Sequence, residues 1–214
     1  MIFINKKQEP KSLLEYRANK SNLADITYDN FRDKDDVRDA LLVEQGHICA
    51  YCMQRITKDK MKIEHFSCQS INETLQLDYK NMLGCCMGGE GQDEDFQHCD
   101  TKKKSKKIKF NPSNPNDKNS LKISYDNNGL ISSKDDEFNR DLNEVLNLNL
   151  ELFKNNRKAV LLQLYESFSK VKRNATKKDC EERLLKFSKP KNGMLPEYCG
   201  IAIYYINKKM VKFS

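Results

Sequence analysis

The chain has 214 residues, which is enough for one large domain or for a small catalytic unit with an attached helical region. The first ten residues contain charges and a proline, and no later stretch is apolar over a membrane-spanning length, so we expect a cytoplasmic protein without a signal peptide. The 38 Lys and Arg residues outnumber the 31 Asp and Glu residues and give a net charge of +7, which suits a polyanionic partner without identifying one.

The first part of the chain predicts one short helix, one longer helix and a β-ribbon. Residues 1–33 are polar and irregular, apart from a short helix expected around Leu13. From Asp35 onward apolar residues recur at helical spacing, and Gly46 follows as a stop signal. The β-prone residues between positions 48 and 66 predict a two-stranded ribbon that carries the Cys-Ala-Tyr-Cys turn.

The second part predicts a loop, a linker with a hairpin, and helices. Residues 84–100 are rich in glycine and acidic side chains and predict a loop, and an Asn-Gly pair ending at Gly129 predicts the turn of a β-hairpin. Pro196 could open the last helix at its first turn, although residues 201–206 could also form a strand. We therefore expect an α+β protein with four parts: an N-terminal arm (1–34), a core containing the cysteine cluster (35–110), a linker and hairpin (111–134) and a helical region (135–214).

The eight cysteines indicate a metal site, because disulfides are uncommon in the cytosol. Cys49 and Cys52 have the spacing with which one turn holds a tetrahedral zinc ion. Either Cys85 or Cys86, followed by Cys99, could complete the site, and His98 is an alternative ligand. A redox role for the Cys-Ala-Tyr-Cys motif ranks lower, since no thioredoxin-like βαβ pattern surrounds it. We expect the remaining cysteines to be buried or unremarkable thiols: Cys68, Cys180 and Cys199.

The candidate catalytic residues lie between the two halves of this cysteine framework. Glu64 could hold a hard divalent cation, and the neutral imidazole of His65 could take a proton from an attacking water. Since adjacent strand residues point to opposite faces, a kink or bulge is needed to bring both to one phosphate. Asn81 could ligate the metal or hold the loop that presents His65, and Asp100 could add an oxygen ligand. A lysine run follows, namely Lys102, Lys103, Lys104, Lys106 and Lys107. It could contact the phosphate backbone of nucleic acid or simply form a solvated surface, and we rank the two alternatives as about equal.

Together these motifs resemble the HNH endonuclease superfamily and, more fully, its PtuB branch. The match comprises residues 41–52 (LLVEQGHICAYC), 63–66 (IEHF), 79–86 (YKNMLGCC) and 98–103 (HCDTKK). The PtuB proteins are the nucleases of Septu-type and retron-associated anti-phage systems. The resemblance implies a zinc-stabilised ββα-metal core with an appended helical C-terminal region, and a PtuA-like ATPase as partner.

The resemblance also implies roles for individual residues. Structural Zn²⁺ would be held by Cys49, Cys52, Cys86 and Cys99. His65 would be the general base, and Glu64 and Asn81 would lie at a catalytic Mg²⁺ or Mn²⁺. This chain has Asp100 where many HNH proteins have histidine or asparagine, and 12 residues separate Cys86 from Cys99, more than in a plain HNH knuckle.

The expected function is cleavage of phosphodiester bonds in nucleic acid, with DNA favoured, as the effector of an anti-phage complex. An RNase, for example one acting on tRNA, is an alternative within the same chemistry. A zinc-knuckle nucleic-acid-binding module without catalysis is an alternative of another class, but such a module has no need of Glu64, His65 and Asn81 together. Residues 135–214 hold no candidate catalytic residue, and we expect them to dock the ATPase.

Overall fold

The computed structural model describes residues 1–19, 26–171 and 174–213 and confirms the α+β class. Within these residues the α-helices are α1 (Lys11–Ala18), α2 (Lys34–Gln45), α3 (Cys99–Lys103), α4 (Asp136–Arg140), α5 (Glu151–Ser169), α6 (Lys177–Ser188) and α7 (Cys199–Met210). The strands are β1 (Lys62–His65), β2 (Met82–Cys85), β3 (Ile123–Tyr125) and β4 (Ile131–Ser133). They form two separate antiparallel pairs, β1 with β2 and β3 with β4.

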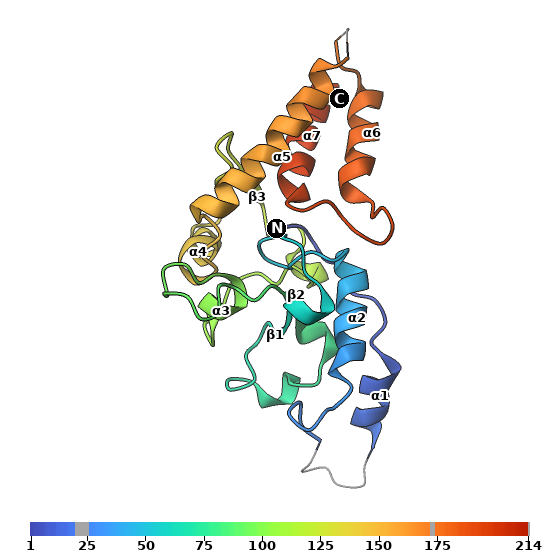
Figure 1. The fold of residues 1–214 in the computed structure, drawn as a ribbon, viewed down its shortest axis with the longest axis vertical. Coiled ribbons are helices and arrows are strands. Elements are labelled where there is room, and N and C mark those ends of the chain that lie inside the picture. The colour runs from blue at the N-terminus through green and yellow to red at the C-terminus, as the bar shows by residue number, and fades with distance from the viewer. Residues whose placement is uncertain (20–25, 172–173, 214) are drawn as a thin grey trace.

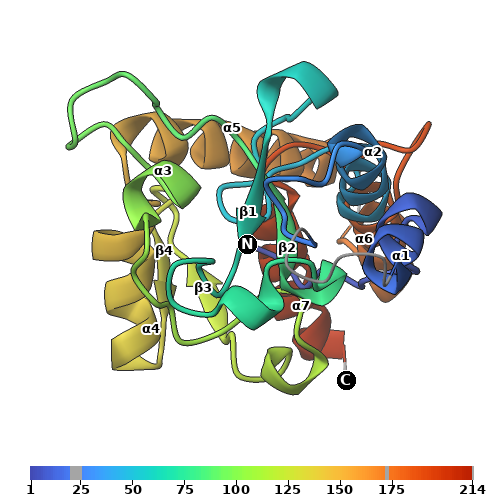
Figure 2. The same ribbon diagram turned by 90° about the horizontal axis from the view of Figure 1, so that it is seen from below.

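The molecule has a helical end and a mixed end. Figure 1 shows α5, α6 and α7 side by side at the top, with α1, α2, β1 and β2 in the lower half. Seen from below in Figure 2, α4 and α1 lie on opposite sides, with β1 and β2 between them. The two ends meet near the cysteine-containing turn, where the amide of Tyr198, just before α7, donates to the carbonyl of Met53 at 3.0 Å. None of the helices in the described residues combines the length and apolar character needed to cross a lipid bilayer.

The helix expected from Asp35 is α2, and its end shows why glycine is required there. Val37 and Leu41 are fully buried on its inner face. Gly46 follows in the left-handed conformation at φ 62°, and its carbonyl accepts a hydrogen bond from the amide of Leu195 at 2.9 Å. A Cβ at this position would also clash with the Leu195 side chain, so the stop signal doubles as a close packing contact.

The predicted hairpin is also present, as β3 and β4. The carboxylate of Asp126 accepts hydrogen bonds from the amides of Asn128 and Leu130, and Gly129 supplies the positive φ of 83° that the turn needs. The preceding linker contains one short 3-10 turn (Pro115–Asp117) within otherwise irregular structure.

Two expectations about secondary structure are wrong, and an alternative left open by the sequence is settled. β1 pairs with β2, with Glu64 opposite Leu83, rather than with a strand before residue 62; only an isolated bridge between Ile48 and Arg55 flanks the Cys-Ala-Tyr-Cys turn. Pro196 lies before the last helix, which begins at Cys199. Residues 201–206 are helical and not a strand, because the buried face of α7 follows a helical repeat against α5 and α6.

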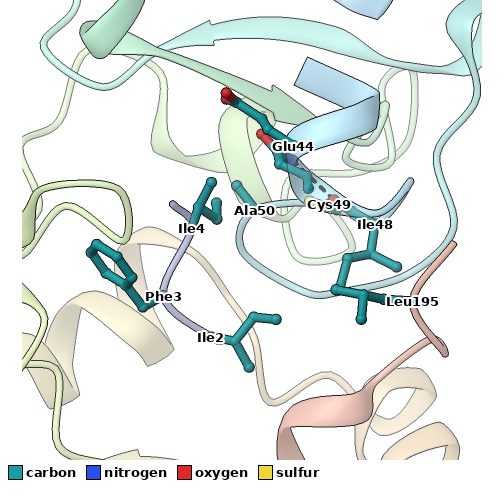
Figure 3. Close-up of a pocket in the computed structure, with 9 residues that line it drawn as sticks. Ile2, Phe3, Ile4, Glu44, Ile48, Cys49, Ala50 and Leu195 are labelled. Atoms are coloured by element: carbon teal, nitrogen blue, oxygen red, sulfur yellow. Dashed lines mark hydrogen bonds between the residues drawn. The ribbon is translucent and has the colours of Figure 1, made fainter. Parts of the chain in front are cut away.

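The first residues of the chain pack against the cysteine-containing turn. The amide of Ile4 donates to the carbonyl of Pro112 at 2.8 Å, and the Lys6 ammonium forms an ion pair with Glu44 at 2.6 Å. Ile2 and Ile4 line a small apolar cavity of about 40 Å³ with Ala50 and other residues of the core (Figure 3). The start of the expected N-terminal arm is therefore part of the core.

Candidate metal centre and active site

Four cysteine thiols from distant segments meet in one buried cluster. Cys49 and Cys52 lie on the turn after α2, Cys86 directly follows β2, and Cys99 begins α3. Their sulfur atoms all lie within 4.8 Å of one another. The Cys49–Cys99 and Cys52–Cys86 sulfur distances are both 3.8 Å, far longer than the roughly 2.05 Å of a disulfide. All eight cysteines are free thiols.

This cluster fits a tetrahedral zinc ion. With zinc–sulfur bonds of about 2.3 Å, the sulfurs of a regular tetrahedron lie about 3.8 Å apart. Burial raises the pKa of the Cys99 thiol, an effect that a bound cation would overcome by stabilising the thiolate. The donor set and its spacing could therefore bind zinc.

The structure separates the candidate ligands that the sequence left open. The group of four contains Cys86 and not its neighbour Cys85. His98 Nδ1 lies 3.3 Å from the sulfur of Cys99 and 3.8 Å from that of Cys86, so its ring is placed beside the cluster. This ring lies nearly perpendicular to the ring of Phe153 in α5, with the ring centroids 4.6 Å apart. We interpret His98 as a neighbour that orients the sulfurs, because the four thiols already complete a tetrahedral set.

The segment between Cys86 and Cys99 is a loop that closes on itself. The amide of His98 donates to the carbonyl of Gly88 at 2.9 Å, which returns the chain to the cluster after 12 intervening residues. Gly88 has φ 61°, and a Cβ there would clash with the carbonyl oxygen of His98. The two ends of the long insertion are therefore held together, and the cluster stays compact.

Glu64 is the buried acid of the site. It lies on β1, and only 4% of its surface is exposed. Its Oε1 accepts a hydrogen bond from the Tyr51 hydroxyl at 3.1 Å and forms an ion pair with the Lys103 ammonium at 2.8 Å. Burial raises the pKa of Glu64 well above its usual range, and the neighbouring Asp100 carboxyl raises this pKa further, while Lys103 opposes both effects. Two carboxyl groups this close favour a shared proton or a cation between them.

His65 is held as a neutral base with a defined tautomer. Its Nε2 lies 2.8 Å from the carbonyl oxygen of Gln76, which can only accept, so the proton is on Nε2. Nδ1 is then the basic nitrogen, and it accepts a hydrogen bond from the Gln69 amide at 3.1 Å. The ring packs edge-on against Tyr28 at 4.5 Å. Burial lowers the pKa of His65, and the imidazole is therefore uncharged at neutral pH.

The bulge that the alternation of strand faces seemed to require is absent. Residues 62–65 pair in regular register with residues 82–85. Glu64 points toward Tyr51 and Lys103, whereas the His65 ring points toward the loop of residues 67–76. Asp100, the second residue of α3, is close enough to affect the pKa values of both side chains. A cation-binding site would therefore be assembled from β1 and α3 together.

Asn81 organises the loop and does not face the acidic pair. Its Oδ1 accepts from the amide of Ser67 at 2.8 Å, and its Nδ2 donates to the carbonyls of Ser67 and Leu75 at 3.0 and 3.2 Å. The whole amide is thus used to hold the loop that positions His65. This geometry supports the loop-holding alternative, and nothing in it supports Asn81 as a metal ligand.

The lysine run divides into one buried and several exposed side chains. Lys103 is fully buried and paired with Glu64, so the expectation that it contacts phosphate at the surface is wrong. Its burial follows from its place one helical turn after Cys99 on α3. Lys102 is half-buried and donates to the carbonyl of Glu94, and exposed Lys104 forms an ion pair with the same residue. The remaining exposed members of the run are Lys106 and Lys107.

Sequence reasoning missed three functional contacts. It assigned no role to Tyr51, Gln69 or the carbonyl of Gln76, although each contacts Glu64 or His65. For Tyr51, the position between the two cysteines of the turn was an available signal, because a residue there must lie beside the metal cluster. The other two contacts depend on the irregular loop 67–76, whose path no local pattern predicts.

Comparison with known proteins finds a relative at low sequence identity. No protein family model matches the chain. A protein of Vibrio cholerae serotype O1 biovar El Tor, provisionally named the HNH endonuclease of retron Vc95, is 26% identical over 141 residues. This chain is similar to a retron HNH endonuclease. The match covers 63% of this chain and 66% of the relative, just under two thirds of its length. The match supports the resemblance to HNH endonucleases, but it does not support the assignment to the PtuB branch in particular.

Proposed function

We propose that this chain is a zinc-stabilised, metal-dependent HNH endonuclease that cleaves phosphodiester bonds of nucleic acid, with DNA as the favoured substrate. The observation that carries the proposal is the placement of a neutral imidazole, His65, near the acidic pair Glu64 and Asp100 on a four-cysteine frame. The similarity to the Vibrio cholerae retron protein supports the same class of chemistry.

The proposed base is His65 Nδ1. The hydrogen bond from Nε2 to the Gln76 carbonyl fixes the ring and leaves Nδ1 to take a proton from water. Since Gln69 donates to Nδ1, this side chain must move aside before a water can bind there. The lowered pKa of His65 keeps the nitrogen unprotonated and ready to accept.

Glu64 and Asp100 are the residues that would hold Mg²⁺ or Mn²⁺. Their carboxyl oxygens are the ligand type that these hard cations prefer. When bound, such an ion offsets the negative charge that develops on the phosphate and on the leaving oxygen. Lys103 provides the positive charge beside Glu64 in the present arrangement, at 2.8 Å.

The exposed lysines next to α3 could bind the phosphate backbone. Lys104, Lys106 and Lys107 follow the proposed metal site directly in the chain. Contacts of this kind are salt-sensitive and carry little sequence information.

The test compares two histidine variants that each remove one imidazole. His65→Asn should reduce cleavage of labelled DNA in Mg²⁺ or Mn²⁺ by at least about 100-fold, the usual contribution of a general base. His47→Asn is the matched control: His47 has a positive φ of 58°, which asparagine tolerates, and lies outside the proposed site. Equal cleavage by both variants would remove His65 from the mechanism.

The same assay separates the alternatives. Cleavage of RNA but not of DNA, lost in His65→Asn, would identify the chain as an RNase. Binding of nucleic acid without any cleavage, with and without a partner, would identify it as a zinc-knuckle binding module and refute the proposal.

A PtuA-like ATPase is the proposed partner, and we propose that it docks on the helical region of residues 135–214. The proposal rests on the resemblance and on the lack of proposed catalytic residues in that region. Truncation is a poor test, because Phe153 of α5 and Ile201 of α7 are fully buried in the shared core. Substitution of the exposed α5 leucines Leu152 and Leu162 by glutamate should instead reduce co-purification with the ATPase. Undiminished co-purification would place the partner elsewhere.

A further inference from the structure

The helical end of the molecule contains an aromatic cleft that the proposed active site does not use. It lies between α5 and α7, has a volume of about 240 Å³, and includes the aromatic rings of Tyr165, Phe168 and Tyr205. The C-terminal ends of both helices are at the top of Figure 1, whereas β1 is in the lower half. The cleft is therefore separate from the site around Glu64.

The two tyrosine rings are held in place. Both hydroxyls donate to Oδ1 of Asn127 in the β3–β4 turn, that of Tyr205 at 2.8 Å and that of Tyr165 at 3.3 Å. The rings are nearly perpendicular, with centroids 6.1 Å apart. Tyr165 is nevertheless 45% exposed. An exposed ring that is held at its polar end loses little conformational entropy when a flat ligand stacks on it.

The wall of the cleft beside the rings is strongly basic. Lys208, Lys209 and Lys212 line it, and with Tyr205 they recur at the spacing of one helical face. Within the described residues, no carboxylate lies within ion-pair distance of these three ammonium groups. Lys209 lies 5.1 Å from the centre of the Phe168 ring. The positive charge is therefore available to a ligand.

We propose that this cleft binds a single-stranded segment of nucleic acid, with bases stacked on the tyrosines and phosphates paired with the lysines. Rings beside unpaired lysines are the combination that binds single strands without sequence preference. A duplex hides the faces of its bases and offers the rings nothing to stack on. This second site extends the proposed nuclease function, because it would bind a part of the nucleic-acid strand other than the part that is cleaved.

The test uses the full chain and a fluorescein-labelled oligothymidine of 20 nucleotides, without added divalent cation, followed by fluorescence anisotropy. Tyr165→Leu combined with Tyr205→Leu keeps the charge and removes the stacking surface, so the affinity should fall about tenfold. The triple variant Lys208→Gln, Lys209→Gln and Lys212→Gln should also weaken binding. It should reduce the slope of log affinity against log salt concentration by about two, because each of three lost phosphate contacts contributes about 0.7 on a single strand. Its matched control removes the same charge from exposed lysines of α6, namely Lys177, Lys178 and Lys186, and should bind almost as the unmodified protein does.

A crosslinking experiment locates the strand directly. An oligonucleotide of the same length containing 5-bromouracil should crosslink under ultraviolet light to Tyr165, Phe168 or Tyr205, as read by mass spectrometry of the peptides. Crosslinks confined to residues 97–107 would overturn the proposal. Equal losses in the cleft and α6 triple variants, or unchanged affinity in the double tyrosine variant with unchanged thermal unfolding, would overturn it as well.

Two further outcomes have a defined meaning. Displacement of the oligonucleotide from the cleft by polyglutamate at equal charge concentration would show a site for acidic peptides and contradict the proposal. If the unmodified protein cleaves no nucleic acid but still crosslinks through the cleft, the proposed nuclease function fails while this inference stands.

Discussion

Replacing one of two adjacent cysteines tests the assignment of the zinc cluster. Cys85 and Cys86 are neighbours in the chain and are both buried, but only Cys86 has its sulfur within 4.8 Å of the other three thiols. Structural zinc contributes about 10–16 kcal/mol in small zinc domains, or about 3 kcal/mol for each of four ligands. Cys86→Ser should therefore weaken zinc binding by about 100-fold, since 1.4 kcal/mol corresponds to a factor of ten.

Cys85→Ser is the matched control for this experiment. It introduces a buried hydroxyl and should cost about 1–3 kcal/mol of unfolding free energy, yet leave the zinc affinity unchanged. The assay is competition for zinc between each variant and a chromogenic chelator, together with the metal content of the purified protein. Loss of zinc from Cys85→Ser with retention by Cys86→Ser would refute the geometric assignment, and equal affinity in both would refute the four-thiol site.

Three other properties can be measured on the same protein. The pKa of His65 is lowered in the folded state, so at mildly acidic pH the unfolded chain binds a proton at this residue more readily than the folded chain does. The unfolding free energy should therefore fall as the pH drops below about 6.5, and it should fall less steeply in His65→Asn. Gly88→Ala should lower the thermal unfolding temperature more than Gly91→Ala does. Both glycines have positive φ, but only at Gly88 would the added Cβ clash with a backbone carbonyl, that of His98. Equal losses would contradict the path of the loop around Gly88. Glu94→Gln frees the exposed lysine with which it pairs and should raise nucleic-acid affinity a few-fold at low salt, whereas an equal gain from Asp93→Asn would show a general charge effect.

The parts of the fold that were predictable from sequence depend on local patterns. The α2 helix with its stop at Gly46 and the hairpin with its turn at Gly129 are each specified by residues within about one element's length. The close pair Cys49 and Cys52 was recognisable for the same reason, since one turn places both thiols.

The pairing of β1 with β2 was not predictable in this way. The 16 residues between the two strands, 66–81, include an irregular loop. The apolar runs that form the strands are short, and each could pair with several other short runs equally well. The geometry around His65 depends on that loop, so the roles of Gln69 and Asn81 became clear only in three dimensions.

Lys103 shows how composition misleads when the helix phase is unknown. Within a run of lysines it has no distinguishing feature, and a lysine run is usually solvated. Once α3 is known to begin at Cys99, a residue four positions later must lie on the same buried face. Its ammonium then meets Glu64, and the pair makes Lys103 part of the acidic site instead of the phosphate-binding surface.

In the proposed active site, the cysteine cluster places Glu64, Asp100 and His65 around one cation-binding position. A crystal structure of the protein soaked in Mn²⁺, with anomalous data for manganese and zinc, tests it most directly. We expect zinc among the four sulfurs and manganese bound by oxygens of Glu64 and Asp100, with His65 Nδ1 facing a water beside the manganese. Manganese bound elsewhere, or a His65 ring turned away from the manganese, would refute the proposed active site.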